Sequence, residues 1–199
     1  MLNIFVRGMA VLAGSAVAIA VVDAAQHPPS SLYTSIALDT CKPQAPGGGA
    51  EKNPPDAPAP GKEWLCAALM PVFAMRRDAR FYLAIGANPR AHRAARQTLD
   101  VPNSPVDPKS NRITIEWRIK TRAAGPRPYA SIIRYFTKQD GRAAEVLVVA
   151  KIDDGQSCHV AYVDAGANQD AIVLARSAAD ETVPGFDCAD GQPVWLGAR

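Results

Sequence analysis

The sequence contains none of the short motifs that mark common catalytic and metal sites. It has 199 residues and three histidines, which lie far apart, and neither H-x-H nor H-E-x-x-H occurs. No G-x-S-x-G follows residue 24, and no two cysteines have the C-x-x-C spacing. These patterns are the usual signals of zinc enzymes, α/β serine hydrolases and structural zinc sites. The sequence therefore predicts no metal and no cofactor.

The N-terminus lacks an apolar run long enough to span a bilayer. Its uncharged stretch, Gly8–Val22, has fifteen residues, whereas a spanning helix needs about 20. Arg7 precedes this stretch, and Val22 and Ala24 place small residues at the −3 and −1 positions of a cleavage site. The arrangement is typical of a secretory signal peptide. We expect cleavage after Ala24, with Ala25 as the alternative. Residues 25–199 are then predicted to form a single periplasmic or secreted domain, not an integral membrane protein.

A strong charge excess is also missing, since the formal net charge is only +3. Removing residues 1–24 takes away Arg7 and Asp23, one charge of each sign, and leaves that value unchanged. Such a mild excess does not favour a nucleic-acid partner.

The four cysteines are predicted to form disulfides, because an exported chain folds in an oxidising compartment. Four cysteines allow three pairings, and sequence alone does not select among them. We favour Cys41 with Cys66 and Cys158 with Cys188, since these partners are neighbours in the sequence and turn residues lie between them.

Proline and glycine are concentrated in residues 42–62, which hold six prolines and four glycines but no large apolar residue. Such a segment cannot offset the entropy cost of being ordered. We expect a flexible loop whose ends are joined by the first disulfide.

Four strands in succession are predicted in the second half of the chain. In the first of them, isoleucines and Trp117 alternate with charged residues such as Glu116 and Arg118, which places the two sets on opposite faces. Asp-Gly turns separate the later strands. The predicted strands are Arg112–Lys120, Tyr129–Lys138, Ala143–Ile152 and Ser157–Asp164, with Thr121–Pro128 as a longer connection.

An amphipathic helix is expected to follow, because small and apolar residues recur every three or four positions over Asp170–Glu181. Asn168 is its expected N-cap. The fold class is therefore α+β: an antiparallel meander with one helix packed on it and two disulfides. Further predicted elements are a strand over Ser31–Leu38, a hairpin of Trp64–Met75 and Phe81–Ile85 (or a helix over Cys66–Met70), a short helix within Ala87–Asn111 and a last strand over Pro193–Leu196.

Three candidate sites emerge from the chemistry-bearing residues. Cys158 and His159 resemble a nucleophile and base, but neighbours in a strand face opposite ways. An enzyme would need a site converging from distant residues, with His159, Glu116 and Arg134 as the first to test. Arginines are the commonest charged residues in the middle of the chain. The guanidinium group of arginine can donate two parallel N–H hydrogen bonds to a carboxylate or phosphate. The candidate anion-binding residues are Arg90, Arg93 and Arg96.

The block CHVAYVDA (residues 158–165) and eight other blocks of this sequence resemble a family of small secreted proteins of Gram-negative bacteria that has no assigned activity. The resemblance covers most of residues 31–199, and CHVAYVDA is its most specific block. It implies export and paired cysteines, and it transfers no catalytic or binding residue. Residues 42–62 look like an insertion relative to that family. The other similar blocks are SLYTSIALDTCK, EWLC, QTL, ITIEWRI, RPYASIIRYFT, EVLVVAKI, GFDC and PVWLGAR.

The leading functional hypothesis is a non-enzymatic periplasmic or envelope binding protein, with an anionic envelope component or an acidic protein as partner. An inhibitor of an extracellular hydrolase is a variant of this class. The alternatives are an enzyme with a site around His159 and an assembly factor that acts through residues 42–62.

Overall fold

The computed structural model describes residues 29–45, 61–122, 125–139, 141–153 and 155–199. The predicted signal peptide and most of the Pro/Gly-rich segment lie outside the described residues. Within that segment, Lys42–Gln44 form strand β2 and are not part of a loop. Among the described residues, no helix has the length and apolar character needed to cross a membrane.

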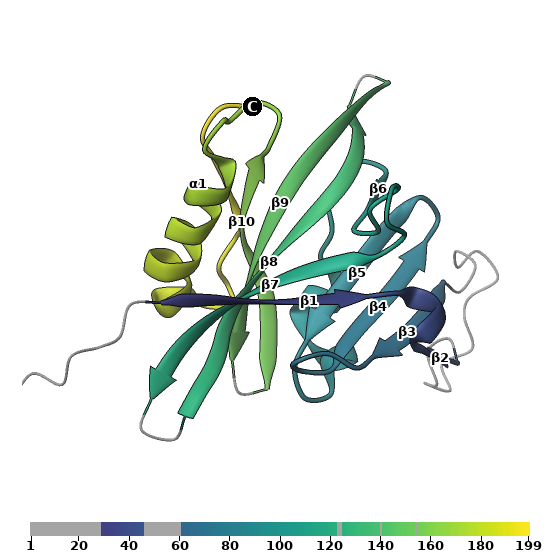
Figure 1. Ribbon diagram of the computed structural model, residues 1–199, viewed down its shortest axis with the longest axis horizontal. Coiled ribbons are helices and arrows are strands. Elements are labelled where there is room, and N and C mark those ends of the chain that lie inside the picture. Colours follow the sequence, from purple (N-terminus) through teal and green to yellow (C-terminus); the bar gives the residue numbers. More distant parts are fainter. Residues whose placement is uncertain (1–28, 46–60, 123–124, 140, 154) are drawn as a thin grey trace, which may run out of the picture.

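The chain forms three layers, a helical segment, a large sheet and a small sheet (Figure 1). The large sheet has seven strands in the order β1-β7-β8-β9-β10-β11, and β6 pairs with β8. Its strands are β1 Ser30–Ile36, β6 Asn103–Ser104, β7 Ile113–Arg122, β8 Gly125–Gln139, β9 Arg142–Asp153, β10 Gln156–Asp164 and β11 Val194–Leu196.

The predicted meander is present as β7 to β10, but the whole sheet is mixed. The last strand, β11, lies parallel to β10, with Tyr162 opposite Trp195. A parallel neighbour needs a long crossover connection, and the helical segment between β10 and β11 supplies it. The prediction of a plain antiparallel meander is therefore wrong at this edge.

The described residues of the segment predicted as a connection, Thr121–Pro128, are strand: residues 121–122 belong to β7 and residues 125–128 to β8. In this segment, β7 and β8 continue their pairing as far as Arg122 opposite Gly125. Pro126 and Pro128 are tolerated because β9 pairs with β8 only from Ala130 onwards. Here β8 is an edge strand, where a missing backbone N–H costs no ladder hydrogen bond.

In the small sheet, the first strand of the predicted hairpin, Trp64–Met75, is divided between β3 and β4, and β4 forms the hairpin with β5. The order of the sheet is β2-β3-β4-β5. The disulfide between Cys41 and Cys66 ties the start of β2 to the end of β3. The alternative helix over Cys66–Met70 does not form. The bounds are β2 Lys42–Gln44, β3 Lys62–Cys66, β4 Val72–Arg77 and β5 Arg80–Ile85, and short 3₁₀ turns lie at η1 Leu38–Thr40, η2 Pro89–Ala91 and η3 Arg93–Arg96.

The predicted helix is α1 (Ala171–Ser177), which continues as a π-helical turn η4 (Ala178–Thr182) and a 3₁₀ turn η5 (Val183–Gly185). Its N-cap is Asp170, so the expectation for Asn168 is wrong. The Asn168 side chain instead donates to the carbonyls of Asp164 and Ala198 and accepts from the Ala198 N–H. It therefore anchors the C-terminal end of the chain.

Both faces of the large sheet are covered. The isoleucines and Trp117 of β7 pack against the small sheet, in a core that includes Val72 and Leu83. On the other face, Ile132, Leu147 and Val149 pack with the alanines of α1 and η4. The charged side of β7 therefore lies under the helical layer. One face of an antiparallel sheet is commonly solvated, but here Glu116 is only 4% exposed and Arg118 only 6% exposed.

Candidate functional site

A cavity of about 400 Å³ lies on the helix-covered side of the large sheet. It is bounded by β1, β7, β8, β9, α1 and the loop between β6 and β7. We call it the arginine-lined cavity, because three arginines from three different elements border it: Arg112, Arg134 and Arg176. The other lining residues are Tyr33, Pro105, Asp107, Thr114, Glu116, Ile132, Phe136, Leu147 and Ile172.

Neighbouring groups fix all three guanidinium groups in place. The Arg112 side chain donates from Nε to Ser35 Oγ at 2.6 Å and from Nη2 to the Ser35 carbonyl at 2.9 Å. Arg176 donates from Nε to Glu116 Oε1 at 2.7 Å and from Nη2 to the Tyr33 hydroxyl at 2.7 Å. Arg134 pairs with Glu145 on the next strand. These contacts use only part of the five donors that each arginine carries.

The floor of the cavity is apolar. Ile132 and Leu147 are buried members of the core beneath α1, and Ile172 packs against the same cluster from the helix. Phe136 adds a half-buried ring from the end of β8. An apolar floor with a few convergent polar groups is the usual composition of a small-molecule site.

A second, more open cavity of about 930 Å³ adjoins the first, and Asp107, Arg134 and Phe136 line both. The β6–β7 loop lies between them. In this loop Asp107 accepts hydrogen bonds from the Lys109 N–H and the Ser110 hydroxyl, which lower its pKa below the usual range. Its carboxylate is therefore engaged within its own loop.

A chain of alternating charges joins the helical layer to β7. Glu116 accepts from Arg176 and from the Ser31 hydroxyl, and its Oε1 lies 3.8 Å from Arg118. Arg118 in turn donates to both carboxylate oxygens of Asp180 on the π-helical turn, at 2.9 and 2.6 Å. Burial alone would lower the pKa of Arg118, but the hydrogen bonds and charge of Asp180 outweigh it and raise that pKa. The buried charges are thus paired throughout.

Tyr129 ends this chain of contacts. Its hydroxyl donates to Asp180 Oδ1 at 2.5 Å. Burial, followed by the hydrogen bond and charge of Asp180, raises the pKa of Tyr129 well above its ordinary value. The hydroxyl therefore stays protonated and serves as a donor, and not as a base.

Two of the three predicted anion-binding arginines contact groups of the chain itself. Arg90 pairs with Glu63 at 2.7 Å and lies over the Phe73 ring. Arg93 donates to the carbonyls of Cys188 and Ala189 at 2.7 and 3.1 Å, and so holds the C-terminal return against the β5–β6 segment. Arg96 is exposed. Two of the three are thus occupied by contacts within the chain.

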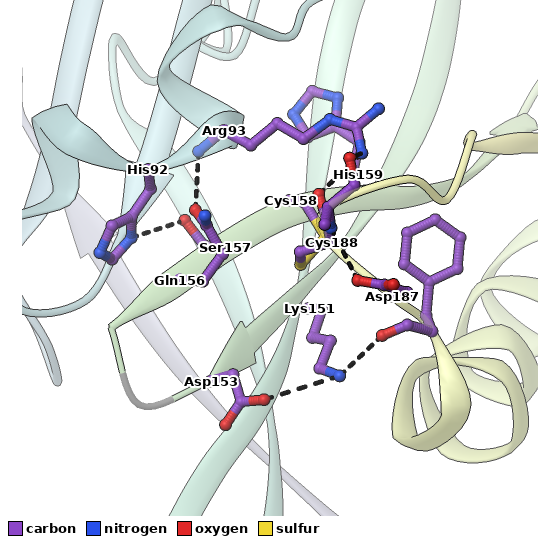
Figure 2. Close-up of a disulfide and its surroundings, with 12 residues drawn as sticks. His92, Arg93, Lys151, Asp153, Gln156, Ser157, Cys158, His159, Asp187 and Cys188 are labelled. Carbon is purple, nitrogen blue, oxygen red and sulfur yellow. Dashed lines mark hydrogen bonds and ion pairs between the residues drawn. A yellow bond between two sulfur atoms is a disulfide. The ribbon is translucent and has the colours of Figure 1, made fainter.

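The Cys158–His159 pair is split as the strand geometry predicts (Figure 2). Cys158 forms the disulfide with Cys188, which confirms the favoured pairing. His159 turns toward the small sheet, where its Nδ1 lies 3.0 Å from the Tyr162 hydroxyl. His159 is 2% exposed, and the space that it lines there is about 10 Å³, no larger than one water. No substrate can reach it there.

The three residues named for an enzyme site do not converge. Glu116 and Arg134 both line the arginine-lined cavity on the helix side of the sheet. His159 lies on the other face of the large sheet, beside its cross-strand neighbour Ala150, and that face packs toward the small sheet. A sheet separates the imidazole from the other two groups.

A serine–histidine contact that the sequence did not indicate occurs at Ser157 and His92 (Figure 2). The Nδ1 atom of His92 lies 3.1 Å from Ser157 Oγ and 3.2 Å from the Ile85 carbonyl. The two side chains are only 2% and 1% exposed, so they are closed to a substrate. Their contact joins the loop after β5 to β10 and is structural.

The cavity residues missed by sequence reasoning are Tyr33, Arg112, Ile172 and Arg176. Arg112 and Arg176 are 64 positions apart in the sequence, and they line the same cavity because the ion pair of Arg176 with Glu116 joins α1 to β7. The one available signal was that Arg176 lies off the apolar stripe of its helix. In an amphipathic helix that position is ordinarily solvated.

Comparisons with known proteins identify no relative. No family model, no curated protein and no solved structure matches this chain. Among the described residues, no group of three or more histidine, cysteine, aspartate or glutamate side chains is placed to hold a metal ion.

Proposed function

We propose that the protein is an exported, non-enzymatic binding protein that holds an anionic ligand in the arginine-lined cavity. The observation that carries this proposal is the convergence of Arg112, Arg134 and Arg176, from the end of the β6–β7 loop, β8 and α1, on one cavity with an apolar floor. Arginine recognises oxyanions through paired donors, and donors held in place lose little entropy on binding.

The two disulfides support export, because disulfides persist in the periplasm and outside the cell. Export also agrees with the apolar N-terminal stretch of the sequence. We further propose that the chain belongs with the small secreted proteins that it resembles.

The alternative of an enzyme site around His159 receives no support from the geometry. A general base must lie within hydrogen-bond reach of its substrate, and the imidazole of His159 is enclosed in the core. Burial also lowers its pKa to about 4, so it is a neutral, inaccessible group at physiological pH.

The proposal is tested by calorimetric titration with a panel of anions: inorganic phosphate, inorganic sulfate, decanoate and heparin. At least one should bind the wild-type protein. The double variant Arg112→Gln/Arg134→Gln should bind it about tenfold or more weakly, since each lost charge-assisted hydrogen bond is worth about 1.5–3 kcal/mol.

Arg96→Gln is the matched control, because it removes an exposed arginine outside the cavity. This variant should bind like the wild type. If the cavity variant bound the anion as tightly as the wild type, the cavity would not be the binding site. A loss of binding confined to Arg96→Gln would place the site in the 90–96 segment. Failure of every anion to bind would refute an anion-binding function.

A further inference from the structure

We propose that the ligand of the arginine-lined cavity is a small amphipathic monoanion, with an apolar body on the cavity floor and one oxyanion group beside the arginines. This inference rests on the proposed function and specifies the ligand class. The oxyanion is a carboxylate, a sulfonate or a phosphate diester, each of which carries one charge and accepts paired hydrogen bonds from guanidinium.

The apolar part of the ligand follows from the floor. Ile132, Leu147 and Ile172 come from β8, β9 and α1, and they form one continuous apolar surface with the core. The ring of Phe136 borders the same space. A fully polar anion, such as inorganic phosphate, would leave this surface in contact with water. An apolar body would cover it and gain the free energy of burial.

The single charge follows from the balance of the lining residues. Arg176 pairs with Glu116 and Arg134 pairs with Glu145, whereas Arg112 is bound only by Ser35 and has no acidic partner within the described residues. Glu116 is already neutralised by Arg176 and lies near Arg118. Asp107 is turned toward its own loop. One negative charge on the ligand completes the balance, and a second would be unpaired.

The donors for that charge are in place before binding. The bonds to Ser35 use Nε and Nη2 of Arg112, and those to Glu116 and Tyr33 use the same two atoms of Arg176. Their Nη1 groups have no hydrogen-bond partner within the described part of the chain. These bonds therefore hold one edge of each guanidinium group, and the Nη1 group at the other edge is available to bind a ligand.

The volume limits the ligand. About 400 Å³ lies near the lower end of the range for small-molecule pockets, which runs from roughly 300 to 1,000 Å³. A medium-chain fatty acid or a compact aromatic sulfonate fits this range, whereas a polymer would have to extend out of the cavity.

The test uses two fluorescent probes that share an aromatic body. One, 8-anilinonaphthalene-1-sulfonate, carries a sulfonate, and the other, N-phenyl-1-naphthylamine, has no charge. The wild-type protein should bind the sulfonate with a saturable increase in fluorescence and bind the neutral probe about tenfold or more weakly. Decanoate should displace the sulfonate, and decanol should not.

Thr114 provides a matched pair of variants, because its exposed side chain lines the cavity beside the arginines. Thr114→Glu introduces a carboxylate of the same size as the amide in Thr114→Gln. We expect Thr114→Glu to bind the sulfonate about tenfold more weakly than Thr114→Gln does, the difference being one like charge. Arg96→Gln, which lies outside the cavity, should bind it like the wild type. Near-ultraviolet circular dichroism of both variants establishes that they are folded.

The outcomes separate this inference from the proposed function. Binding of inorganic sulfate, phosphate or heparin without binding of the amphipathic sulfonate would overturn the ligand class and leave an anion-binding function standing. Equal binding of the charged and neutral probes would overturn both. Equal loss in Thr114→Glu and Thr114→Gln would show that the charge is not recognised at this cavity, and would overturn the inference as well.

Discussion

Single residues of the same type have different roles in this protein, and burial decides between them. Glu116 on β7 pairs with Arg176 of α1, and Glu145 on β9 pairs with Arg134 of β8. The side chain of Glu116 is 5% exposed, whereas that of Glu145 is 44% exposed. A buried carboxylate that loses its partner pays a desolvation cost, but an exposed one is rehydrated. Only the first of these pairs can therefore matter for the fold.

His159 gives a pH prediction at this scale. Burial lowers its pKa from 6.5 to about 4. The unfolded chain thus binds one more proton than the native state between these values, and stability falls as the pH drops through that interval. A shift of this size corresponds to roughly 3 kcal/mol at most. Urea unfolding of the wild type at pH 7 and pH 4.5 should show this loss.

The variant His159→Gln should lose less stability over the same interval, because glutamine does not titrate. Its absolute stability at pH 7 is expected to be lower, since the contact of His159 with Tyr162 is disturbed. The pH slope and not the absolute value is the readout. An unchanged slope in this variant would assign the acid sensitivity to other groups.

The position of Cys158 and His159 on opposite faces could be predicted from sequence, because alternation in a strand is a local property. The burial of Glu116 could not. Its neighbours in β7 alternate as they would on a solvated sheet, and its partner Arg176 lies 60 residues further along the chain. Sequence patterns report the period of a strand, but not what covers its polar face.

At the scale of elements, the four central strands and the helix followed from their periodicity. The departures have local physical causes. Pro126 and Pro128 suggested a connection, yet they occupy a stretch of β8 where only β7 is a neighbour. The parallel β11 is a three-residue strand whose pairing depends on the preceding crossover. Neither arrangement leaves a signal within a short window of sequence.

The helical layer is attached to β7 by charge as well as by apolar packing. Four charged groups alternate along the contact, namely Arg176, Glu116, Arg118 and Asp180. Asp180 lies in the π-helical turn. Such turns are frequently found at functional sites. This attachment brings Arg176 to the wall of the cavity.

We therefore predict that Glu116→Gln destabilises the protein and that Glu145→Gln does not. Breaking a fully buried pair costs about 3–5 kcal/mol. Because the side chain of Arg176 is 39% exposed, we expect a smaller loss of about 2 kcal/mol for Glu116→Gln. For Glu145→Gln, whose pair is exposed on both sides, the change should stay below about 0.5 kcal/mol. Urea unfolding at pH 7 measures both, and similar values for the two variants would contradict this account.

At the scale of the whole molecule, the cavity belongs to one half of the structure. Its lining residues come from the large sheet, the β6–β7 loop and α1, and within the described ranges none comes from β2, β3, β4 or β5. The small sheet packs on the far face and is closed by its own disulfide. A ligand would thus contact the helical layer and the large sheet directly, and the small sheet only through the core.

This arrangement predicts where a bound ligand changes local stability. Amides that exchange by local opening in β1, in the β6–β7 loop and in the first turn of α1 should exchange more slowly when decanoate is bound, because these segments border the cavity. Amides that open locally in β3, β4 and β5 should keep their rates. Amides that exchange only after global unfolding should exchange more slowly by the same factor in every element, since the ligand stabilises the native state as a whole.

Hydrogen exchange followed by mass spectrometry, with and without decanoate, measures these rates in all three layers at once. The Thr114→Glu variant is the control, and decanoate should leave its exchange unchanged at the same concentration. Slower local exchange in the small sheet, with none around α1, would place the ligand on the far side of the large sheet. In that case Arg112, Arg134 and Arg176 would be structural, because they would hold the surrounding elements in place without contacting a ligand.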